Sequence, residues 1–191
     1  SQEELEMLAR KKVKHLYLGI ESGLDDVLKF MKKDHDLAQA YQAIDRLHEA
    51  GLIYDAHIMT GVAGKGRGME NAEALAQFLN RTNPAHVVNF SMFLHKEVPL
   101  YQDIRQGTFV PADELETIRE EYHLIERIAP EKAGANILYD GFHDFIHVRV
   151  RGHLPGDKEK MLAKLNGIIQ EYEGKEPVYS FVQGECPDLE Y

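Results

Sequence analysis

A strand-like run that ends in a glycine turn occurs twice, and this repeat limits the possible folds more than any other feature of the sequence. Residues 16–23 read LYLGIESG, and residues 58–64 read IMTGVAG. Each apolar run stops at small or polar residues and is followed by a helix-like pattern. Repeated strand–turn–helix units predict an α/β fold with parallel strands and right-handed crossovers. Such folds bind ligands at the carboxyl ends of their strands, which is where Glu21 falls.

Apolar periodicity and local stop signals give the expected order of the elements. Asp36 is the expected N-cap of the clearest helix and Gly51 its stop, and Asp157 is the expected cap of the last helix. Expected strands cover residues 15–20, 54–60, 86–94, 137–139 and 146–150, and expected helices cover residues 2–12, 24–31, 37–50, 69–80, 111–128 and 157–172. Three buried parallel strands with helices do not close a domain, so half of a barrel fits the pattern better.

The charge balance and the cysteine content exclude several classes of protein. The chain has 191 residues, a formal net charge of −10 and one cysteine, Cys186. The negative charge disfavours nucleic acid as a partner, because DNA and RNA binding needs a phosphate-neutralising surface. One cysteine cannot form a disulfide framework or a multi-thiolate metal site. The sequence has neither a long apolar run nor a signal-peptide pattern, so we expect a cytoplasmic protein that does not enter a membrane.

Several short motifs resemble one enzyme family in their order and spacing. They are GIESG at residues 19–23, LKFMKK at 28–33, the glycine turn at 61–64 and PLY at 99–101. Together they resemble the C-terminal half of a radical S-adenosylmethionine (SAM) enzyme. The likeness is greatest to the Fe–S oxidoreductase branch related to oxygen-independent coproporphyrinogen oxidase. The resemblance implies that residues 1–130 hold strands four to six of a partial (β/α) TIM-like barrel, and that residues 131–191 form a small α/β extension.

The same resemblance implies a cofactor and a reaction. Enzymes of this family use a [4Fe–4S] cluster to cleave SAM and start radical chemistry on a substrate, here an unknown small molecule. The family's Cys-x-x-x-Cys-x-x-Cys signature is absent, and the chain begins at Ser1 without a methionine. Either the N-terminal half of the barrel has been removed or the chain is a degenerate homologue, and we expect removal. We also expect that this fragment binds no cofactor and is inactive alone, and that it self-associates through an exposed strand edge.

Residue by residue, the resemblance implies a set of SAM contacts, each with a plainer alternative. In the family, a polar residue at the end of strand four faces SAM, a basic residue reaches its carboxylate, and glycines let the backbone approach the adenine. The corresponding positions here are Glu21, Ser22, Lys33, His57, Gly61, Gly64 and Ser91. In the plainer alternative Glu21 caps the following turn, Lys33 is a solvated surface lysine and His57 is a satisfied core histidine. Ser91 either faces the barrel interior or lies beneath the helices.

Two other functions stay open at this point. His143 and His147 have the i, i+4 spacing that binds a metal if the segment is helical, although residues 142–148 are more typical of an extended chain. With His57 they would suit a metal-dependent barrel hydrolase or lyase. A non-catalytic module that binds a partner through its acidic helices is the other alternative.

Overall fold

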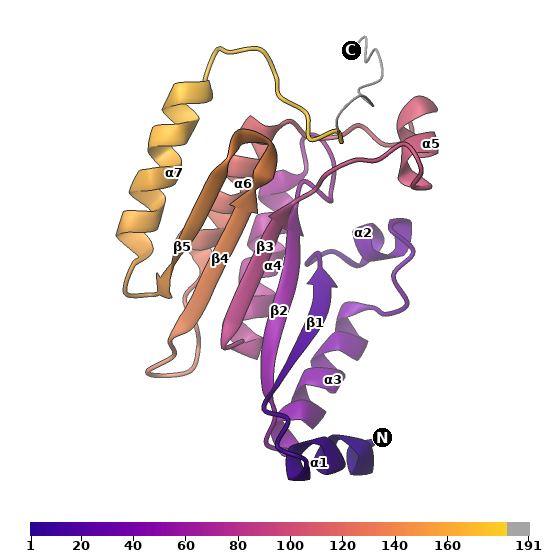
Figure 1. Ribbon diagram of the computed structural model, residues 1–191, viewed down its shortest axis with the longest axis vertical. Helices are drawn as coiled ribbons and strands as arrows, with labels where there is room; N and C mark the ends of the chain where they lie inside the picture. The colour runs from indigo at the N-terminus through magenta and orange to yellow at the C-terminus, as the bar shows by residue number, and fades with distance from the viewer. Residues whose placement is uncertain (183–191) are drawn as a thin grey trace.

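The computed structural model describes residues 1–182, so Cys186 lies outside the described range. Within that range one sheet has the strand order β1-β2-β3-β4-β5 (Figure 1). The elements are α1 (Gln2–Arg10), β1 (His15–Glu21), α2 (Asp25–Phe30), α3 (Leu37–Glu49), β2 (Ile53–Thr60), α4 (Gly68–Thr82), β3 (His86–Ser91), α5 (Leu100–Arg105), α6 (Glu114–Arg127), β4 (Ile137–His143), the 3₁₀ helix η1 (Asp144–Ile146), β5 (Val148–Leu154) and α7 (Lys158–Tyr172). Strands β1 to β4 are parallel, and β5 runs antiparallel to β4.

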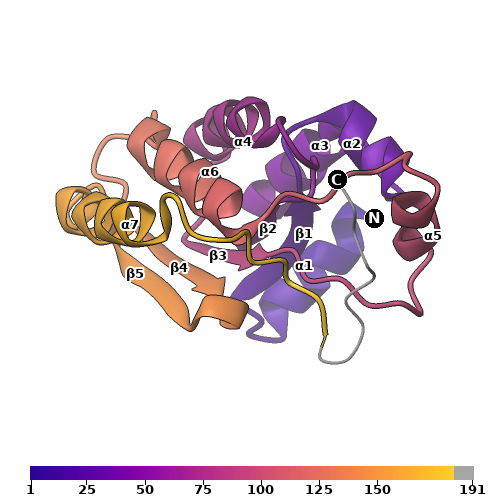
Figure 2. The same cartoon turned by 90° about the horizontal axis from the view of Figure 1, so that it is seen from above.

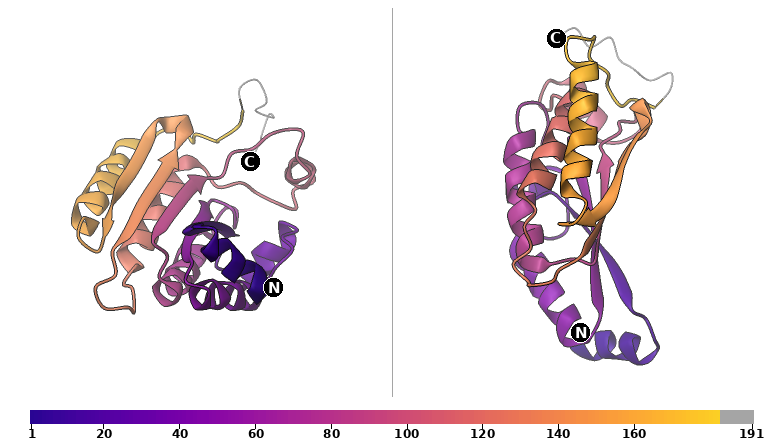
Figure 3. Two further views of the ribbon diagram at one scale, coloured as in Figure 1. Left: turned by 60° about the horizontal axis from the view of Figure 1, so that its bottom comes forward. Right: turned by 90° about the vertical axis from the view of Figure 1, so that its left-hand side faces the viewer.

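Helices α3, α4, α6 and α7 form one layer against one face of the sheet. Figure 2 shows α3, α4, α6 and α7 on the same side, and within residues 1–182 no second helix layer covers the other side (Figure 3, right). Alternate residues of β2 such as Tyr54, Ala56 and Ile58 are fully buried beneath the helices. The sheet is thus an open (β/α) half-barrel whose second face is left to other contacts. We call this second face the open face.

The strand register fixes which residues lie on the open face. His57 pairs with Gly19 of β1 and Val88 of β3, and Phe90 pairs with Met59 of β2 and Phe142 of β4. Because side chains alternate between the two faces, the registered rows share a face. The open face therefore carries His15, Tyr17 and Gly19 of β1, Ile53, Asp55, His57 and Met59 of β2, His86, Val88 and Phe90 of β3, Leu138, Asp140 and Phe142 of β4, and Arg149, Arg151 and His153 of β5. Glu21 follows a register shift and pairs with Ile58, but its carboxylate lies on the open face, since a Cβ at Gly19 would lie 2.8 Å from its Oε1 atom.

The local stop signals act largely as expected. Asp36 and Gln39 form a reciprocal capping box at the start of α3, and Gly51 follows the helix with φ at +75°. Asp157 occupies the N-cap of α7, but its carboxylate accepts a hydrogen bond from the amide of His153 rather than from the helix. Capping geometry is decided locally, which explains why a single sequence can predict it.

The region after residue 130 differs most from expectation. Instead of two short strands, it contains β4 and β5, two seven-residue strands joined by η1. β4 pairs in parallel with β3, so this region continues the same sheet. β5 alternates exposed residues with the buried Val150, Gly152 and Leu154, which is typical of a strand with one covered face, and Gly152 interrupts its apolar pattern. α5 was also not anticipated.

Two segments from distant parts of the chain meet above the carboxyl ends of the strands. Leu94 forms a parallel bridge with Phe181, and the Leu94 amide donates to the Ser180 carbonyl at 2.7 Å. Both side chains join an apolar cluster with Met92, Ile104 and Phe109. This packing holds residues 178–182, which we call the C-terminal strap, against the rim of the sheet where ligands bind in α/β folds.

The free edge of β1 leads to a prediction about self-association. β1 pairs with β2 on one side, and a groove of about 450 Å³ runs along its other side between Leu18, Gly19 and Ile20 and the α3 residues Gln39 and Ala43. Unpaired strand edges template pairing with a second chain. We expect the weight-average mass from light scattering to rise with protein concentration. A monomeric mass over the whole concentration range would contradict this.

Candidate functional site

Glu21 and Lys33 form an ion pair at the carboxyl end of β1. The Nζ atom of Lys33 lies 3.3 Å from Oε1 of Glu21, and both side chains are partly exposed. The pairing register with β2 shifts between Gly19 and Glu21, and Glu21 has a φ of +63°. The turn after α2 brings Lys33 back to the strand end. Two residues twelve positions apart thus form a compact pair of opposite charges, while their contact with SAM stays a prediction.

Ser22 and its neighbour Glu21 lie in different environments, and only Glu21 is accessible to solvent. The Ser22 hydroxyl is fully buried, donates to Oδ1 of Asn71 at 2.6 Å and accepts from the amide of Leu24. No side chain caps α2 at Leu24, so Glu21 does not fill the capping role suggested as the plainer alternative. The serine holds the turn together, which leaves the carboxylate of Glu21 for the ion pair with Lys33.

Ser91 lies beneath the helices, the second of the two orientations considered for it. Its hydroxyl donates to Glu114 at 3.2 Å, and neighbouring Asn89 donates to Oε1 of Glu121 at 3.0 Å. Both are buried on the face that α6 covers. The alternate residue Phe90 lies on the open face instead.

His57 belongs to a row of ring contacts that crosses the open face. Its ring centroid lies 5.0 Å from that of Tyr17 and 5.9 Å from that of Phe90. Phe90 stacks on Phe142 at 5.6 Å, and the Arg149 guanidinium lies 4.7 Å from the centre of the Phe142 ring. We call Tyr17, His57, Phe90, Phe142 and Arg149 the ring ladder; each of the five strands contributes one member. His57 is half-buried here, rather than enclosed in the core.

The two predicted glycines allow close approach between protein segments. Gly61 and Gly64 have φ values of +82° and +80°. A Cβ at Gly61 would lie 2.8 Å from Cγ2 of Thr117, and one at Gly64 would lie 2.9 Å from the carbonyl of Val110. Glycine is required at both positions for these reasons alone. Gly64 also lines a cavity of about 360 Å³ beside Phe30 and Phe109.

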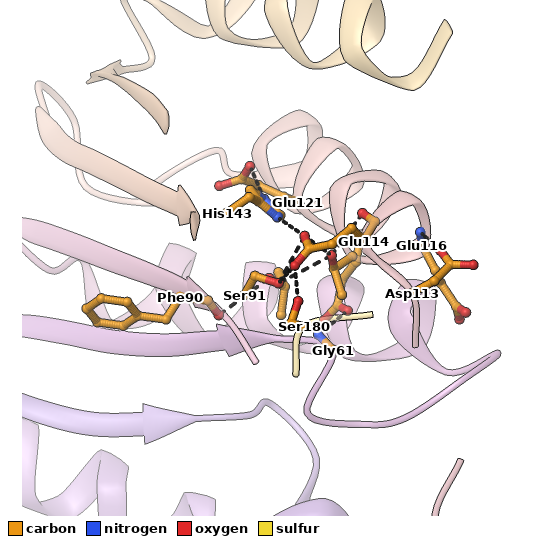
Figure 4. A network of polar contacts seen from close by, with 12 residues as sticks. Gly61, Phe90, Ser91, Asp113, Glu114, Glu116, Glu121, His143 and Ser180 are labelled. Atoms are coloured by element: carbon orange, nitrogen blue, oxygen red, sulfur yellow. Dashed lines mark hydrogen bonds and ion pairs between the residues drawn. The ribbon is translucent and has the colours of Figure 1, made fainter. Parts of the chain in front are cut away.

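A buried acid–imidazole network lies on the helix side of the same rim (Figure 4). Nδ1 of His143 lies 3.0 Å from Oε2 of Glu114, and Nε2 lies 3.0 Å from Oε2 of Glu121. All three side chains are buried. Burial opposes a charged imidazole, but the two carboxylates outweigh it and raise the pKa of His143 to about 10. Burial likewise opposes ionised Glu114, yet His143 and its other hydrogen-bond donors keep the pKa of that carboxyl below its usual value.

Glu120 extends this network to the strand-end turns. Its carboxylate accepts hydrogen bonds from the Gly61 amide at 2.8 Å and from Nδ2 of Asn71 at 2.7 Å. Asn71 in turn accepts from the Ser22 hydroxyl and the Gly23 amide. Burial raises the pKa of Glu120 to about 7. The turns after β1 and β2 are therefore tied to α6 through buried polar groups.

The C-terminal strap and β4 are joined to the same helix. The Ser180 hydroxyl donates to Oε1 of Glu114, and the Glu114 amide donates to the carbonyl of Val178. Tyr139 donates to Glu121 at 2.9 Å, and a Cβ at Gly141 would collide with Oε1 of Glu121. From one helix, the network thus holds the ends of β3 and β4, the turns after β1 and β2, and the C-terminal strap.

Sequence reasoning missed the network because α6 was recognised by its apolar residues. Glutamates on a helix are usually solvated, so nothing marked these as buried. The available signal was their spacing: Glu114, Thr117 and Glu121 recur at i, i+3 and i+7 beside the buried Ile118 and Ile125. Such a polar stripe next to an apolar stripe indicates a helix that buries both.

The histidine metal site is not formed. His143 is buried in the network, whereas His147 is exposed and ends η1 in the left-handed region with φ at +55°. The expected i, i+4 helix is a strand followed by a 3₁₀ turn, and His57 lies on the opposite face of the sheet. Across residues 1–182 no group of three or more histidine, cysteine, aspartate or glutamate side chains could hold a metal ion.

Removing the imidazole should cost much of the stability. We expect His143→Ala to lower the free energy of unfolding by about 3–5 kcal/mol, because it leaves two buried carboxylates without their cation. The exposed His153→Ala on the next strand is the matched control and should change it by less than about 0.5 kcal/mol. Urea denaturation followed by circular dichroism measures both. Equal effects of the two variants would contradict the network's role.

The raised pKa values of Glu120 and His143 also predict how stability depends on pH. Native Glu120 keeps its proton to about pH 7, whereas its unfolded pKa is 4.5, so stability falls as pH rises between these values. His143 contributes stability that is complete below its unfolded pKa of 6.5 and is lost as pH rises through about 10. Glu120→Gln should remove the decline in unfolding midpoint between pH 4.5 and 7 and leave the alkaline decline. An unchanged slope in the acidic range would refute the assignment to Glu120.

Comparisons with known proteins agree with the coarser part of the resemblance, that to radical SAM proteins, and do not show the relation to oxygen-independent coproporphyrinogen oxidase. Residues 1–79 match the model of the Radical SAM superfamily. A curated protein of Methanocaldococcus infernus, described as a tRNA uridine(34) acetyltransferase, is 25% identical over 119 residues, covering 62% of this chain and 22% of its own length. A solved structure of Elp3 from the same organism, with residues 1–46 deleted, superposes with a TM-score of 0.62 at 18% identity, covering 90% of this chain and 39% of that one.

These comparisons define both the likeness and its extent. The structural likeness shows a shared fold, that of a partial radical SAM (β/α) barrel. The chain spans about a fifth of the curated relative's length. Among residues 1–182, no helix is both long and apolar enough to span a membrane. The match to the Radical SAM superfamily covers residues 1–79, and the likeness to the solved structure over 90% of the chain is one of fold.

Proposed function

We propose that this chain is the C-terminal part of a radical SAM enzyme and forms one wall of its SAM pocket. The observation that carries the proposal is the Glu21–Lys33 pair at the carboxyl end of β1. The methionine part of SAM bears an ammonium and a carboxylate, and a neighbouring carboxylate and ammonium complement those two charges. The pair is partly exposed, so a ligand reaches it without disrupting the core.

The residues present fit SAM but not the iron–sulfur cluster. The donor set for SAM consists of Glu21 for the ammonium, Lys33 for the carboxylate and the half-buried His57 for a ribose hydroxyl. The chain has a single cysteine, whereas such a cluster needs three thiolates from the protein. Under this proposal the cluster ligands come from another segment. Bound together, SAM and the reduced cluster would supply the radical that starts the reaction.

The chain's own residues then have distinct tasks. Glu21 and Lys33 orient the charged end of the ligand, and the glycine turn at 61–64 presents backbone at the rim. Glu120, Asn71 and Ser22 hold the two turns from the helix side and act as positioning residues. This division is consistent with a cofactor that performs the difficult chemistry while the protein orients it.

We further propose an oxidoreductase-type reaction on a small molecule, in a cytoplasmic enzyme. The sequence motifs related to oxygen-independent coproporphyrinogen oxidase support the reaction type. The net charge of −10 supports a small molecule over a nucleic acid, although one similar protein is described as acting on tRNA. The missing half of the barrel is the proposed partner for the free edge of β1.

SAM cleavage tests the proposal directly. Under anaerobic reducing conditions, a longer protein that joins this chain to a reconstituted cluster-binding half should form 5′-deoxyadenosine, and this chain alone should form none. Glu21→Gln in the longer protein should weaken SAM binding about tenfold, because one charge-assisted hydrogen bond is lost. Glu171→Gln on the exposed face of α7 is the matched control. No product from a fully loaded protein, or product from this chain alone, would reject the proposal.

A further inference from the structure

The half of the open face farthest from Glu21 has its own chemistry. Phe90 of β3 and Phe142 of β4 are directly opposite in the register, and their rings stack at 5.6 Å with an interplanar angle of 17°. Phe90 is 36% exposed. Phe142 is half-buried. The two nearly parallel rings on neighbouring strands form an apolar shelf. We call these two rings the phenylalanine shelf.

Two arginines of β5 border this shelf. Arg149 pairs directly with Phe142 in the register, and its guanidinium lies over that ring at 4.7 Å. Arg151 is two residues further along the same face. Their side chains are 51% and 55% exposed. The stacked guanidinium extends the shelf, since Arg planes stack on aromatic faces.

One carboxylate serves both arginines, so the patch keeps a positive charge. Asp140 accepts a bidentate pair of hydrogen bonds from Arg149 at 2.8 and 2.6 Å. Nε of Arg151 lies 3.7 Å from the same carboxylate, which is beyond hydrogen-bonding distance. Burial lowers the pKa of neighbouring His86, so that imidazole adds no charge at neutral pH. The patch therefore contains two cations, Arg149 and Arg151, and one anion, Asp140.

We propose that the phenylalanine shelf with Arg149 and Arg151 binds a flat aromatic ring that carries an anionic group. The ring stacks on Phe90 and on the Arg149 guanidinium that covers Phe142, and the anion takes the charge that Asp140 leaves uncompensated. The inference rests on the proposed function and deepens it. The Glu21–Lys33 end of the ring ladder holds SAM, and the β4–β5 end holds the substrate on the same face.

Matched small probes test this in the chain as it exists. 2-Naphthoate has a flat ring and a carboxylate, 2-naphthol has the ring without the charge at neutral pH, and cyclohexanecarboxylate has the charge without the flat ring. NMR spectra of protein labelled in its phenylalanine rings report the binding. We expect 2-naphthoate to shift the Phe90 and Phe142 signals and to bind about fivefold more tightly than either of the other probes.

Variants separate the charge from the ring. Arg151→Met should lower the affinity for 2-naphthoate about fivefold and leave that for 2-naphthol unchanged. Arg151 is chosen because Arg149→Met would leave nearly buried Asp140 without its bidentate partner. Phe142→Leu should weaken both aromatic probes. Arg119→Met, which removes an exposed arginine on the helix layer, is the matched control and should change neither affinity.

Three results would overturn the inference. The first is equal affinity for 2-naphthoate and 2-naphthol. The second is a set of signal shifts confined to phenylalanines other than Phe90 and Phe142. The third is a dimer in which a second copy of the chain covers the phenylalanine shelf and no probe binds. The SAM cleavage experiment does not use these residues. SAM cleavage by the longer protein without selective probe binding would therefore reject the substrate class alone.

Discussion

The buried contact of His143 with Glu114 and Glu121 is the interaction on which the rim of this protein depends. An imidazolium between two carboxylates removes the large cost of burying either charge alone, and each carboxylate also accepts neutral donors. Through these donors, α6 holds the end of β3, the end of β4 and the C-terminal strap. One helix thereby fixes segments that lie far apart in the sequence.

The network also explains why the two faces of the sheet differ. On the helix side, the polar groups at the strand ends are buried and hydrogen-bond to one another, so no ligand reaches them. Ser22 and Ser91 are examples. On the open face, partly exposed charges and rings remain: the Glu21–Lys33 pair at one edge and the phenylalanine shelf with its arginines at the other. Because the polar groups on the helix side are hydrogen-bonded in fixed positions, the open face can present its partly exposed charges and rings at fixed positions.

Particular residues show how far a sequence alone predicts such a site. The resemblance assigned Glu21 and Lys33 to one SAM site, which stays a prediction, and the structure places their charged groups 3.3 Å apart. Ser91 could not be assigned to a face, since that depends on the register of β2 with β3. His143 was considered for a metal because its helical spacing with His147 was conceivable. The residue instead ends a strand beside glutamates more than twenty positions away.

By itself, the sequence determined the parallel strand–helix order, the capping of α3 at Asp36 and the polar strand end at Glu21, since each depends on periodicity or on residues within one or two turns. Only the tertiary structure decided that β4 and β5 extend the same sheet, that three glutamates of α6 are buried, and that Tyr17, His57, Phe90, Phe142 and Arg149 form one row. The reason is that pairing register and helix packing are set by contacts between segments far apart in the chain, and no local pattern records which distant residue a side chain will meet.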